Sequence, residues 1–176
     1  PNAKNTIKFE FLNTFVDNSA GLHKYVDPKD SRTYIYSHLE PFFCHRWFPC
    51  FDQPNIRAPL DLNVLSPAED WVIVANAATK SIAKLSDVTN FKHLVKDGEE
   101  FWHHEFEQCP PISTYIYNMC AGQFDVIENE DSTCEIPMRI FLRNSKKDNI
   151  NAPELFRVIK VGIKFYESYT GVKFPW

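Results

Sequence analysis

Glycine is scarce in this chain, with five residues among 176. That scarcity argues against flexible low-complexity linkers and against the glycine-rich loops that hold phosphates. No apolar run approaches the length of a membrane helix, so no membrane segment is expected. The net charge of -4 is spread out, without a block of like charge or a basic stripe interleaved with aromatics. Nucleic acid is therefore not an expected partner.

The five cysteines lack the spacing of a disulfide framework or of a structural zinc site. Their number is odd, and no Cys-x-x-Cys pair occurs. Glycosylation sequons of the form Asn-x-Ser/Thr are also absent, and together these features favour a reducing, cytoplasmic setting. The amino end has neither an initiator methionine nor a signal peptide, so we expect a segment cut from a longer protein.

Apolar and aromatic residues are plentiful, at 44% and 15% of the sequence. A chain of this length and composition is typical of one globular domain with a sizeable core. The sequence shows no internal repeat and no change of composition that would mark a boundary. Residues 1–176 are therefore expected to form a single β-rich domain.

Short runs with β-strand character dominate most of the chain. They cover residues 7–11, 34–36, 60–64, 71–74, 101–106, 114–119 and 138–142. Turn signals separate them, including a bend expected at Cys109-Pro110-Pro111. Short strands at this spacing favour an antiparallel β-sandwich or a saddle-like sheet.

The carboxyl end changes to a helical period. Apolar or small residues recur there at three- and four-residue steps, at Leu155, Ile159, Gly162, Ile163 and Tyr166. Asn151 followed by Glu154 is typical of a capping box, and Gly171 stands where a helix often ends. The predicted fold class is thus mainly β, an antiparallel saddle-like β-sandwich with one C-terminal α-helix.

Residues 38–54 concentrate side chains that could carry chemistry: two carboxylates, two thiols, two imidazoles, a guanidinium and large aromatics. The stretch also holds three prolines, each of which removes an amide donor and fixes its own φ. A long helix is therefore precluded here. We expect a loop held in a defined shape.

Metal ligation within the segment is not supported by spacing. A helical zinc site needs His at i and i+4, but Gln108 stands where the second ligand to His104 would lie, and residues 103–107 alternate like a surface strand. The four side chains His38, Cys44, His45 and Cys50 also fit no structural zinc pattern. We therefore predict no metal ligand in residues 1–176.

A nucleophile within the segment is equally poorly supported. Cys44 and His45 could form a Cys–His pair, but neighbours on an extended strand point to opposite faces. Neither a Gly-x-Ser-x-Gly elbow nor a Gly-x-x-x-x-Gly-Lys loop is present. The prediction is that this segment contains no catalytic residue and has no activity alone.

The loop at 38–54 nevertheless resembles a known signature. Glu40-Pro41, followed by Phe48-Pro-Cys-Phe-Asp-Gln-Pro54 and by Arg57-Ala58, is similar to the pattern of the aminopeptidase N family of zinc metallopeptidases of the gluzincin type. Further matches lie at Gly21-Leu22, at Ala75-Asn76, from Ser113 through Phe124, and at Tyr169–Pro175. The resemblance runs through nearly the whole chain, in order.

That resemblance implies the amino-terminal domain of such an enzyme, a β saddle that closes one side of the active-site cleft. The zinc motif of the family, His-Glu-x-x-His, and its exopeptidase motif do not occur in residues 1–176. Zinc is therefore expected in the full protein but not bound by this segment. The implied partners are the amino terminus of a peptide substrate and the remaining domains of the same protein.

Two residues carry the implied substrate contact. Glu40 matches the side chain that holds the free α-amine of the peptide, which a carboxylate does by ion pairing and hydrogen bonding. The alternative is that Glu40 only caps a turn before Pro41. His38 stands where relatives often carry Gln, and a protonated imidazole there would oppose the substrate amine.

The remaining residues of the loop are expected to be structural. Cys50, Phe51 and Pro54 are interpreted as core and turn elements, and Asp52 as a partner of nearby backbone or of an arginine. Many relatives have Arg where this chain has His45, and the arginine here comes one position later. On a regular strand that shift would move the basic group to the opposite face.

The resemblance implies the cleft-forming segment of an aminopeptidase, a hydrolase that releases residues from peptide N-termini. A non-catalytic scaffold or assembly subunit on the same fold is the alternative. An isolated β-sandwich interaction module is a third reading, disfavoured because missing first strands would expose sheet edges.

Overall fold

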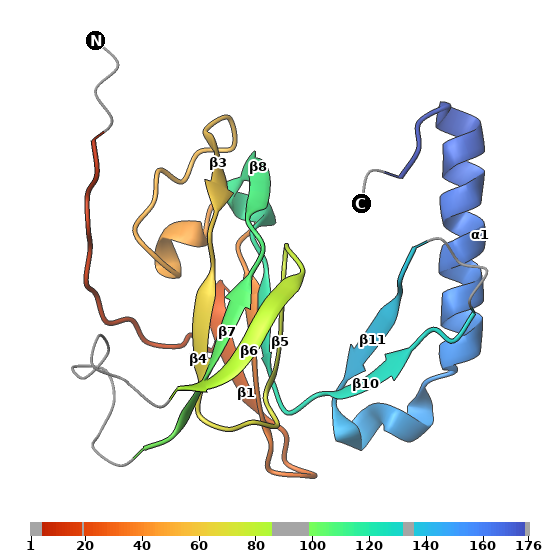
Figure 1. The fold of residues 1–176 in the computed structure, drawn as a ribbon, viewed down its shortest axis with the longest axis horizontal. Coiled ribbons are helices and arrows are strands. Elements are labelled where there is room, and N and C mark those ends of the chain that lie inside the picture. The colour runs from red at the N-terminus through yellow and green to blue at the C-terminus, as the bar shows by residue number, and fades with distance from the viewer. Residues whose placement is uncertain (1–4, 19, 86–98, 132–135, 175–176) are drawn as a thin grey trace. The chain divides into compact units, whose positions relative to one another are not determined.

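The computed structural model describes residues 5–18, 20–85, 99–131 and 136–174. Strand residues make up 36% of the described residues and helical residues 20%, so the class is mainly β. The sheets are antiparallel, and an α-helix follows them near the carboxyl end (Figure 1). The predicted fold class is therefore confirmed. Within the described residues, no helix is both long enough and apolar enough to cross a membrane.

The chain divides by its contacts into two compact units, Pro1–Gln123 and Phe124–Trp176. The expectation of a single domain over residues 1–176 stays a prediction.

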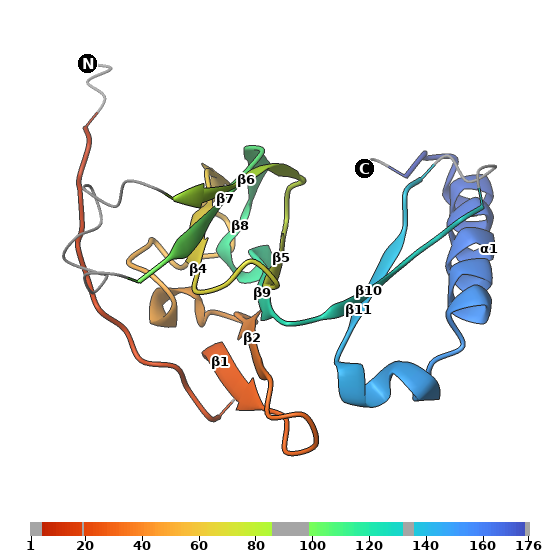
Figure 2. The same ribbon diagram turned by 60° about the horizontal axis from the view of Figure 1, so that its bottom comes forward.

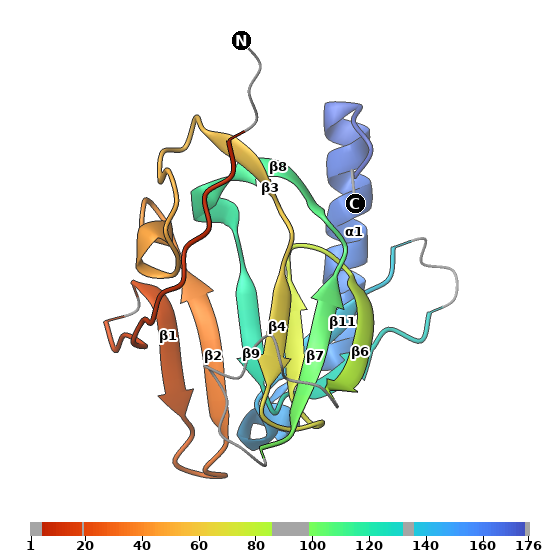
Figure 3. The same cartoon turned by 60° about the vertical axis from the view of Figure 1, so that its left-hand side comes forward.

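The described residues of the first unit form three antiparallel sheets. The largest has the order β1-β2-β9-β5, and Figure 3 shows β1, β2 and β9 side by side. Its strands are β1 Gly21–Val26, β2 Thr33–His38, β9 Met119–Gly122 and β5 Val72–Ala75. The second sheet has the order β4-β7-β6, with β4 Asn63–Ser66, β7 Phe101–Phe106 and β6 Thr79–Leu85. The third pairs β3 Arg57–Leu60 with β8 Cys109–Ser113.

One apolar cluster joins two of these sheets. The four-stranded sheet contributes Ile35, Ile73, Met119 and Ala121, and β7 contributes Phe106. All five side chains are buried. The predicted β-rich runs 34–36, 71–74 and 101–106 each place a residue in this core, and burial of that residue stabilises the strand.

Several predicted strands differ from those observed. The run 60–64 is divided between β3 and β4, and the expected bend at Cys109-Pro110-Pro111 is part of β8. Prolines are tolerated there because β8 belongs to a two-stranded sheet, where an amide donor is not needed on the outer side. The run 114–119 is wrong as a strand, since the 3-10 helix η3 Thr114–Ile116 precedes β9.

The predicted strand at residues 7–11 is also not observed. Within the described residues, these positions join none of the sheets, and Ile7 is 70% exposed. The bridge between Val16 and His23 is the first pairing after them. Alternation alone cannot form a strand, because a strand needs a neighbour to satisfy its amides and carbonyls.

The second unit consists of a hairpin, a 3-10 helix and an α-helix (Figure 2). Strand β10 Asp125–Glu128 pairs with β11 Arg139–Leu142, and η4 Asn144–Asn149 leads into α1 Ala152–Thr170. Both predicted ends of the helix are confirmed. The Asn151 side chain accepts a hydrogen bond from the Glu154 amide at 3.2 Å, and Gly171 adopts a left-handed φ of 71° as the C-cap.

The buried face of α1 is not the one marked by its apolar periodicity. Ala152 and Phe156 are buried, whereas Leu155, Ile159 and Tyr166 are exposed. The helix has apolar residues around most of its circumference, so periodicity identified a helix without identifying its inward face.

Candidate substrate-amine site

The loop that carries both predicted site residues starts at the end of β2. His38 is the last residue of that strand and lies opposite Gly21 of β1. Leu39 is 2% exposed, while the residues on either side of it, His38 and Glu40, are exposed. Burial thus alternates along these three positions, which is consistent with His38 and Glu40 facing away from the core that holds Leu39.

The chain turns immediately after Glu40. The Glu40–Pro41 peptide bond is cis, and the Phe43 amide donates to the Leu39 carbonyl at 2.7 Å. The 3-10 helix η1 Cys44–Arg46 follows. Within the residues that the structure describes, no side chain forms a hydrogen bond or an ion pair with the Glu40 carboxylate. Its oxygens are therefore available to an external donor.

Gly21 allows η1 to lie against the sheet. A Cβ at this position would meet Arg46 Cβ at 2.8 Å, closer than two such atoms can approach. Gly21 also has a φ of 105°, in the left-handed region that favours glycine. This close approach holds η1 beside the end of β2, where His38 is located.

Asp52 links η1 to Thr114, which lies far along the chain. Its Oδ2 accepts a hydrogen bond from the His45 backbone amide at 3.0 Å and lies 2.9 Å from His45 Nδ1. Its Oδ1 accepts a hydrogen bond from the Thr114 hydroxyl at 2.7 Å. A carboxylate accepts but cannot donate, so His45 carries its proton on Nδ1.

These hydrogen bonds also set the protonation of Asp52. Burial raises the pKa of its carboxyl, but the hydrogen bonds from the His45 amide, the Thr114 hydroxyl and the His45 ring outweigh that effect. The pKa of Asp52 therefore lies below its ordinary value. The predicted structural role of Asp52, a partner of nearby backbone, is confirmed; its side-chain partners are His45 and Thr114 instead of an arginine.

A second apolar cluster packs against the loop and holds it in place. Leu39, Cys44 and Tyr117 form it, and Trp47, Phe48, Cys50, Leu60 and Ile112 pack against it. The Tyr117 hydroxyl donates to the Ala58 carbonyl at 2.8 Å. The Ser113 hydroxyl donates to the Pro54 carbonyl at 2.5 Å, which holds the end of the loop. The residues flanking Glu40 are thus fixed by packing and hydrogen bonds.

The loop is not an extended strand at Cys44–Arg46, and one of its aromatic side chains is not buried. Cys44 and His45 lie in a 3-10 helix, so the argument from an extended strand does not apply to them or to Arg46. The Arg46 guanidinium lies 4.8 Å from the centre of the Phe43 ring. Phe51 is 79% exposed, and it is therefore not a core residue.

The predicted strand at His103–Glu107 is confirmed by β7, although one of its histidines is buried instead of on the surface. His104 lies 3.0 Å from the Ser66 hydroxyl, and the two side chains share a hydrogen bond. Burial, together with the nearby charge of His103, lowers the pKa of His104, so this imidazole is held neutral. Glu105 instead pairs with Lys80 across the ladder at 2.6 Å.

Zinc does not fit the described part of this chain. Among those residues, no group of three or more His, Cys, Asp or Glu side chains could hold a metal ion. Cys44, Cys50, Cys109 and Cys120 are free thiols, and Cys134 lies outside the described residues.

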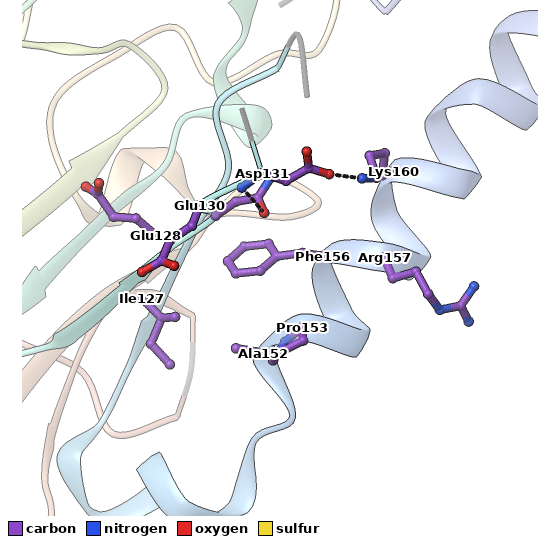
Figure 4. A pocket seen from close by; sticks show the side chains of 10 residues that line it. Ile127, Glu128, Glu130, Asp131, Ala152, Pro153, Phe156, Arg157 and Lys160 are labelled. Carbon is purple, nitrogen blue, oxygen red and sulfur yellow. Dashed lines mark hydrogen bonds and ion pairs between the residues drawn. The ribbon is translucent and has the colours of Figure 1, made fainter. Parts of the chain in front are cut away.

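A hollow in the second unit was not predicted from the sequence. It has a volume of about 450 Å³ and lies between the segment that follows β10 and the first turns of α1 (Figure 4). Phe156 points toward that segment, and Asp131 forms an ion pair with Lys160 across the opening. Arg157 points away and is paired with Glu154 at 2.7 Å. The hollow brings together no nucleophile and base.

Sequence reasoning missed the residues that shape the loop from a distance. Thr114 is separated from Asp52 by 62 positions, and Tyr117 is separated from Ala58 by 59. Neither pair has a short-range spacing that could identify it. The arrangement as a whole presents an exposed carboxylate, Glu40, on a loop with many internal contacts, which suits binding of a cation better than covalent chemistry.

Comparison with known proteins identifies the family of the chain. The profile of the family described as the Peptidase M1 N-terminal domain matches residues 1–116. The chain is 25% identical to Aminopeptidase N of Streptomyces lividans over 92% of its length, and 29% identical to Probable aminopeptidase 1 of Sulfurisphaera tokodaii over 87%. It is 25% identical to the mitochondrial Aminopeptidase 2 of Saccharomyces cerevisiae over 96%.

The first unit is thus a set of antiparallel β-sheets, and its loop exposes the Glu40 carboxylate. The chain belongs to the peptidase M1 N-terminal domain family. It spans about a sixth of the length of these relatives, with 17%, 17% and 16% of each covered. The matched residues 1–116 lie within the first unit.

Proposed function

We propose that this chain is the amino-terminal, cleft-forming segment of a zinc-dependent aminopeptidase, which releases residues from the amino ends of peptides. Family membership and the names of the relatives support the proposal. The single observation that carries a role for this segment is Glu40. It is an exposed carboxylate on a loop that Asp52, Leu39 and Tyr117 hold in place.

Glu40 would bind the α-ammonium group of the substrate. An ammonium donates up to three hydrogen bonds, and a carboxylate accepts them while neutralising the charge. Holding the amino end at one point fixes which peptide bond can reach the reacting groups, so the same contact selects for exopeptidase cleavage. Because the loop is already ordered by its own contacts, little conformational entropy would be lost on binding.

His38 would modify the same site from the end of β2. Its neutral imidazole can accept a hydrogen bond from the substrate amine, whereas its protonated form would repel it. A glutamine at this position would offer the hydrogen bond without the charge.

Zinc belongs to the proposal for the whole protein only. It would be held by residues outside 1–176, because the described residues of this chain offer no suitable ligand set. When bound, zinc polarises the scissile carbonyl and activates water. The contribution of this segment is to bind and orient the peptide amino end.

The test uses the full-length protein, measured for zinc content and for hydrolysis of short peptides. Glu40→Ala is expected to lower kcat/KM by about 10- to 100-fold, since hydrogen bonds to charged groups contribute about 1.5–3 kcal/mol. The matched control is Glu69→Ala, another exposed glutamate in a turn, which should leave kcat/KM unchanged. An unchanged kcat/KM for Glu40→Ala would remove the amine-binding role.

The same experiment addresses a non-catalytic scaffold on this fold. A full-length protein that contains no zinc and hydrolyses no peptide would contradict the proposed aminopeptidase. A protein that is active but insensitive to Glu40→Ala would keep the enzyme and reject only the residue assignment.

A further inference from the structure

Two thiols in the Glu40 loop lie in contact with one another. Cys44 begins η1 and is 0% exposed, whereas Cys50 is half-buried. Each thiol influences the pKa of the other, which is consistent with two neighbouring sulfurs. Cys50 also packs against the apolar cluster to which Cys44 belongs. Six positions of chain separate them, so their contact closes a short loop.

The backbone around both cysteines is already folded back on itself. The Phe48 amide donates to the Cys44 carbonyl at 3.1 Å, which turns the chain after η1. The His45 amide donates to the Asp52 carboxylate at 3.0 Å. His45 directly follows Cys44, and Asp52 lies two positions after Cys50. The contacts that bring the thiols together are thus present without any covalent link. A disulfide needs such close, preformed positions because its geometry tolerates little distortion.

We propose that Cys44 and Cys50 form a modification site, at which exchange with a low-molecular-weight disulfide of the glutathione type converts the two thiols into an intramolecular disulfide. The proposal concerns residues of this chain alone. It does not depend on aminopeptidase activity, and its test does not measure activity.

The reaction proceeds by two exchange steps. Cys50 loses its proton to solvent, and its sulfur attacks one sulfur of the small disulfide, which releases one small thiolate and leaves a mixed disulfide on Cys50. Cys44 then loses its proton, and its sulfur attacks the Cys50 sulfur, which releases the second small thiolate. Two protein thiols are oxidised, and one small disulfide is reduced to two small thiols. The two protons lost by the protein end on those thiolates.

The surroundings assign the order of attack. Cys50 is accessible to a small disulfide, whereas the buried Cys44 is reached only by the neighbouring sulfur. Burial raises the pKa of both thiols, but the neighbouring Cys44 lowers the pKa of Cys50, whereas the neighbouring Cys50 raises that of Cys44. Cys50 is thus the first nucleophile and Cys44 the second. Since both pKa values are raised, the reaction is expected to be faster at pH 9 than at pH 7.

Other cysteines provide the controls. Cys109 is 3% exposed and packs near Tyr117, so it could compete for Cys44 or Cys50. Cys120 lies on β9 and is not part of either thiol's surroundings. A disulfide that involves Cys109 would therefore contradict the proposal, whereas Cys120→Ala should have no effect.

Tryptic peptides distinguish these linkages. Trypsin cleaves after Arg32, Arg46 and Arg57, which places Cys44 in peptide 33–46 and Cys50 in peptide 47–57. The other three cysteines fall together in peptide 97–139. The full-length protein is equilibrated in mixtures of reduced and oxidised glutathione, quenched in acid, alkylated and digested without reduction. Mass spectrometry then shows which peptides remain linked.

The expected result is a linked pair of peptides 33–46 and 47–57, whose share rises with the ratio of oxidised to reduced glutathione. Cys44→Ala should abolish it and leave Cys50 as a mixed disulfide with glutathione, while Cys120→Ala should leave the linked pair unchanged. Absence of the pair in the most oxidising mixture overturns the proposal. So does a link from either peptide to 97–139. Circular dichroism shows whether each cysteine variant folds. If one does not, the linkage found in the wild-type protein still tests the proposal.

Discussion

The His45 backbone amide donates to the Asp52 carboxylate at 3.0 Å, and the His45 ring nitrogen Nδ1 lies 2.9 Å from the same oxygen. One carboxylate oxygen therefore holds both the backbone and the side chain of a single residue. The other oxygen accepts from Thr114, so Asp52 connects η1 to η3. Because Glu40 lies in the same loop, this arrangement contributes to the position of the proposed amine-binding carboxylate.

Replacing the Asp52 carboxylate by an amide should destabilise the first unit. Asp52→Asn keeps the shape of the side chain but replaces one oxygen by an NH₂ group. That group cannot accept a hydrogen bond from the His45 donors or from the Thr114 hydroxyl. A loss of about 1–3 kcal/mol in the free energy of unfolding is expected, measured by urea denaturation. Asp17→Asn, at an exposed aspartate, should change this free energy by less than about 0.5 kcal/mol. Equal effects of the two substitutions would contradict the bridging role of Asp52.

The stabilising effect of Asp52 should disappear in acid. Its pKa in the folded protein lies below the ordinary value, so the unfolded chain takes up the proton first as the pH falls. The contribution is fully present above about pH 3.9, the ordinary pKa of an aspartate, and is lost as the pH falls through the lower folded pKa. The difference in unfolding free energy between the wild type and Asp52→Asn should thus shrink below pH 4. A difference that stayed constant down to pH 2 would oppose this.

His104 should make the protein sensitive to milder acid. Burial holds the pKa of His104 in the folded protein below the ordinary value near 6.5. Between these two pKa values the unfolded chain binds a proton at His104 and the folded chain does not. The free energy of unfolding is therefore expected to fall as the pH drops below about 6.5, and it continues to fall until the folded pKa is reached. His104→Gln should be less stable at pH 7, where the hydrogen bond to Ser66 is weakened, but its stability should vary less between pH 7 and 5.

The control for His104 is its neighbour on the same strand. His103→Gln removes the repulsion from the His103 charge, which is the smaller cause of the lowered pKa of His104, and leaves the burial of His104 in place. Most of the pH dependence should therefore remain in that variant. If His103→Gln flattened the profile as much as His104→Gln did, burial of His104 would not be its cause.

Two glycine-to-alanine substitutions should have opposite effects. Gly21→Ala adds a Cβ that meets Arg46 Cβ at 2.8 Å at a φ of 105°, so a loss of about 1–3 kcal/mol is expected. Gly162→Ala adds a Cβ inside α1 with nothing within 4 Å, which should stabilise the helix by about 0.5–1 kcal/mol. Unfolding monitored by circular dichroism measures both. A neutral Gly21→Ala would show that η1 can move away from β1.

Local signals in the sequence predicted those elements whose determinants lie within a few residues. The strands β2, β5 and β7 follow from short runs of residues with β-strand character, and each run contributes a residue to the shared core. Both ends of α1 follow from Asn151 and Gly171, whose effects act over a single turn. The family resemblance was likewise carried by short motifs, each contiguous in the sequence. The family profile matches residues 1–116 and confirms the family, while the role of Glu40 stays a prediction.

Elements that depend on distant partners could not be predicted in this way. The strand pattern at residues 7–11 has no described neighbour to pair with, and the apolar positions around α1 did not indicate which face is buried. Proline at positions 110 and 111 indicated a bend, yet pairing with β3 made the segment a strand. In each case the outcome depended on what lay beside the segment.

The family, the strand class and the helix boundaries were determined by the sequence itself, because propensity, periodicity and capping act between residues close along the chain. The contact of Asp52 with Thr114, across 62 positions, was decided only by the tertiary structure. So was the shared environment of Cys44, Cys50 and Tyr117, which η1, η3 and the β3-β8 sheet bring together. Such contacts arise when whole elements pack to bury apolar surface, and no local spacing encodes them.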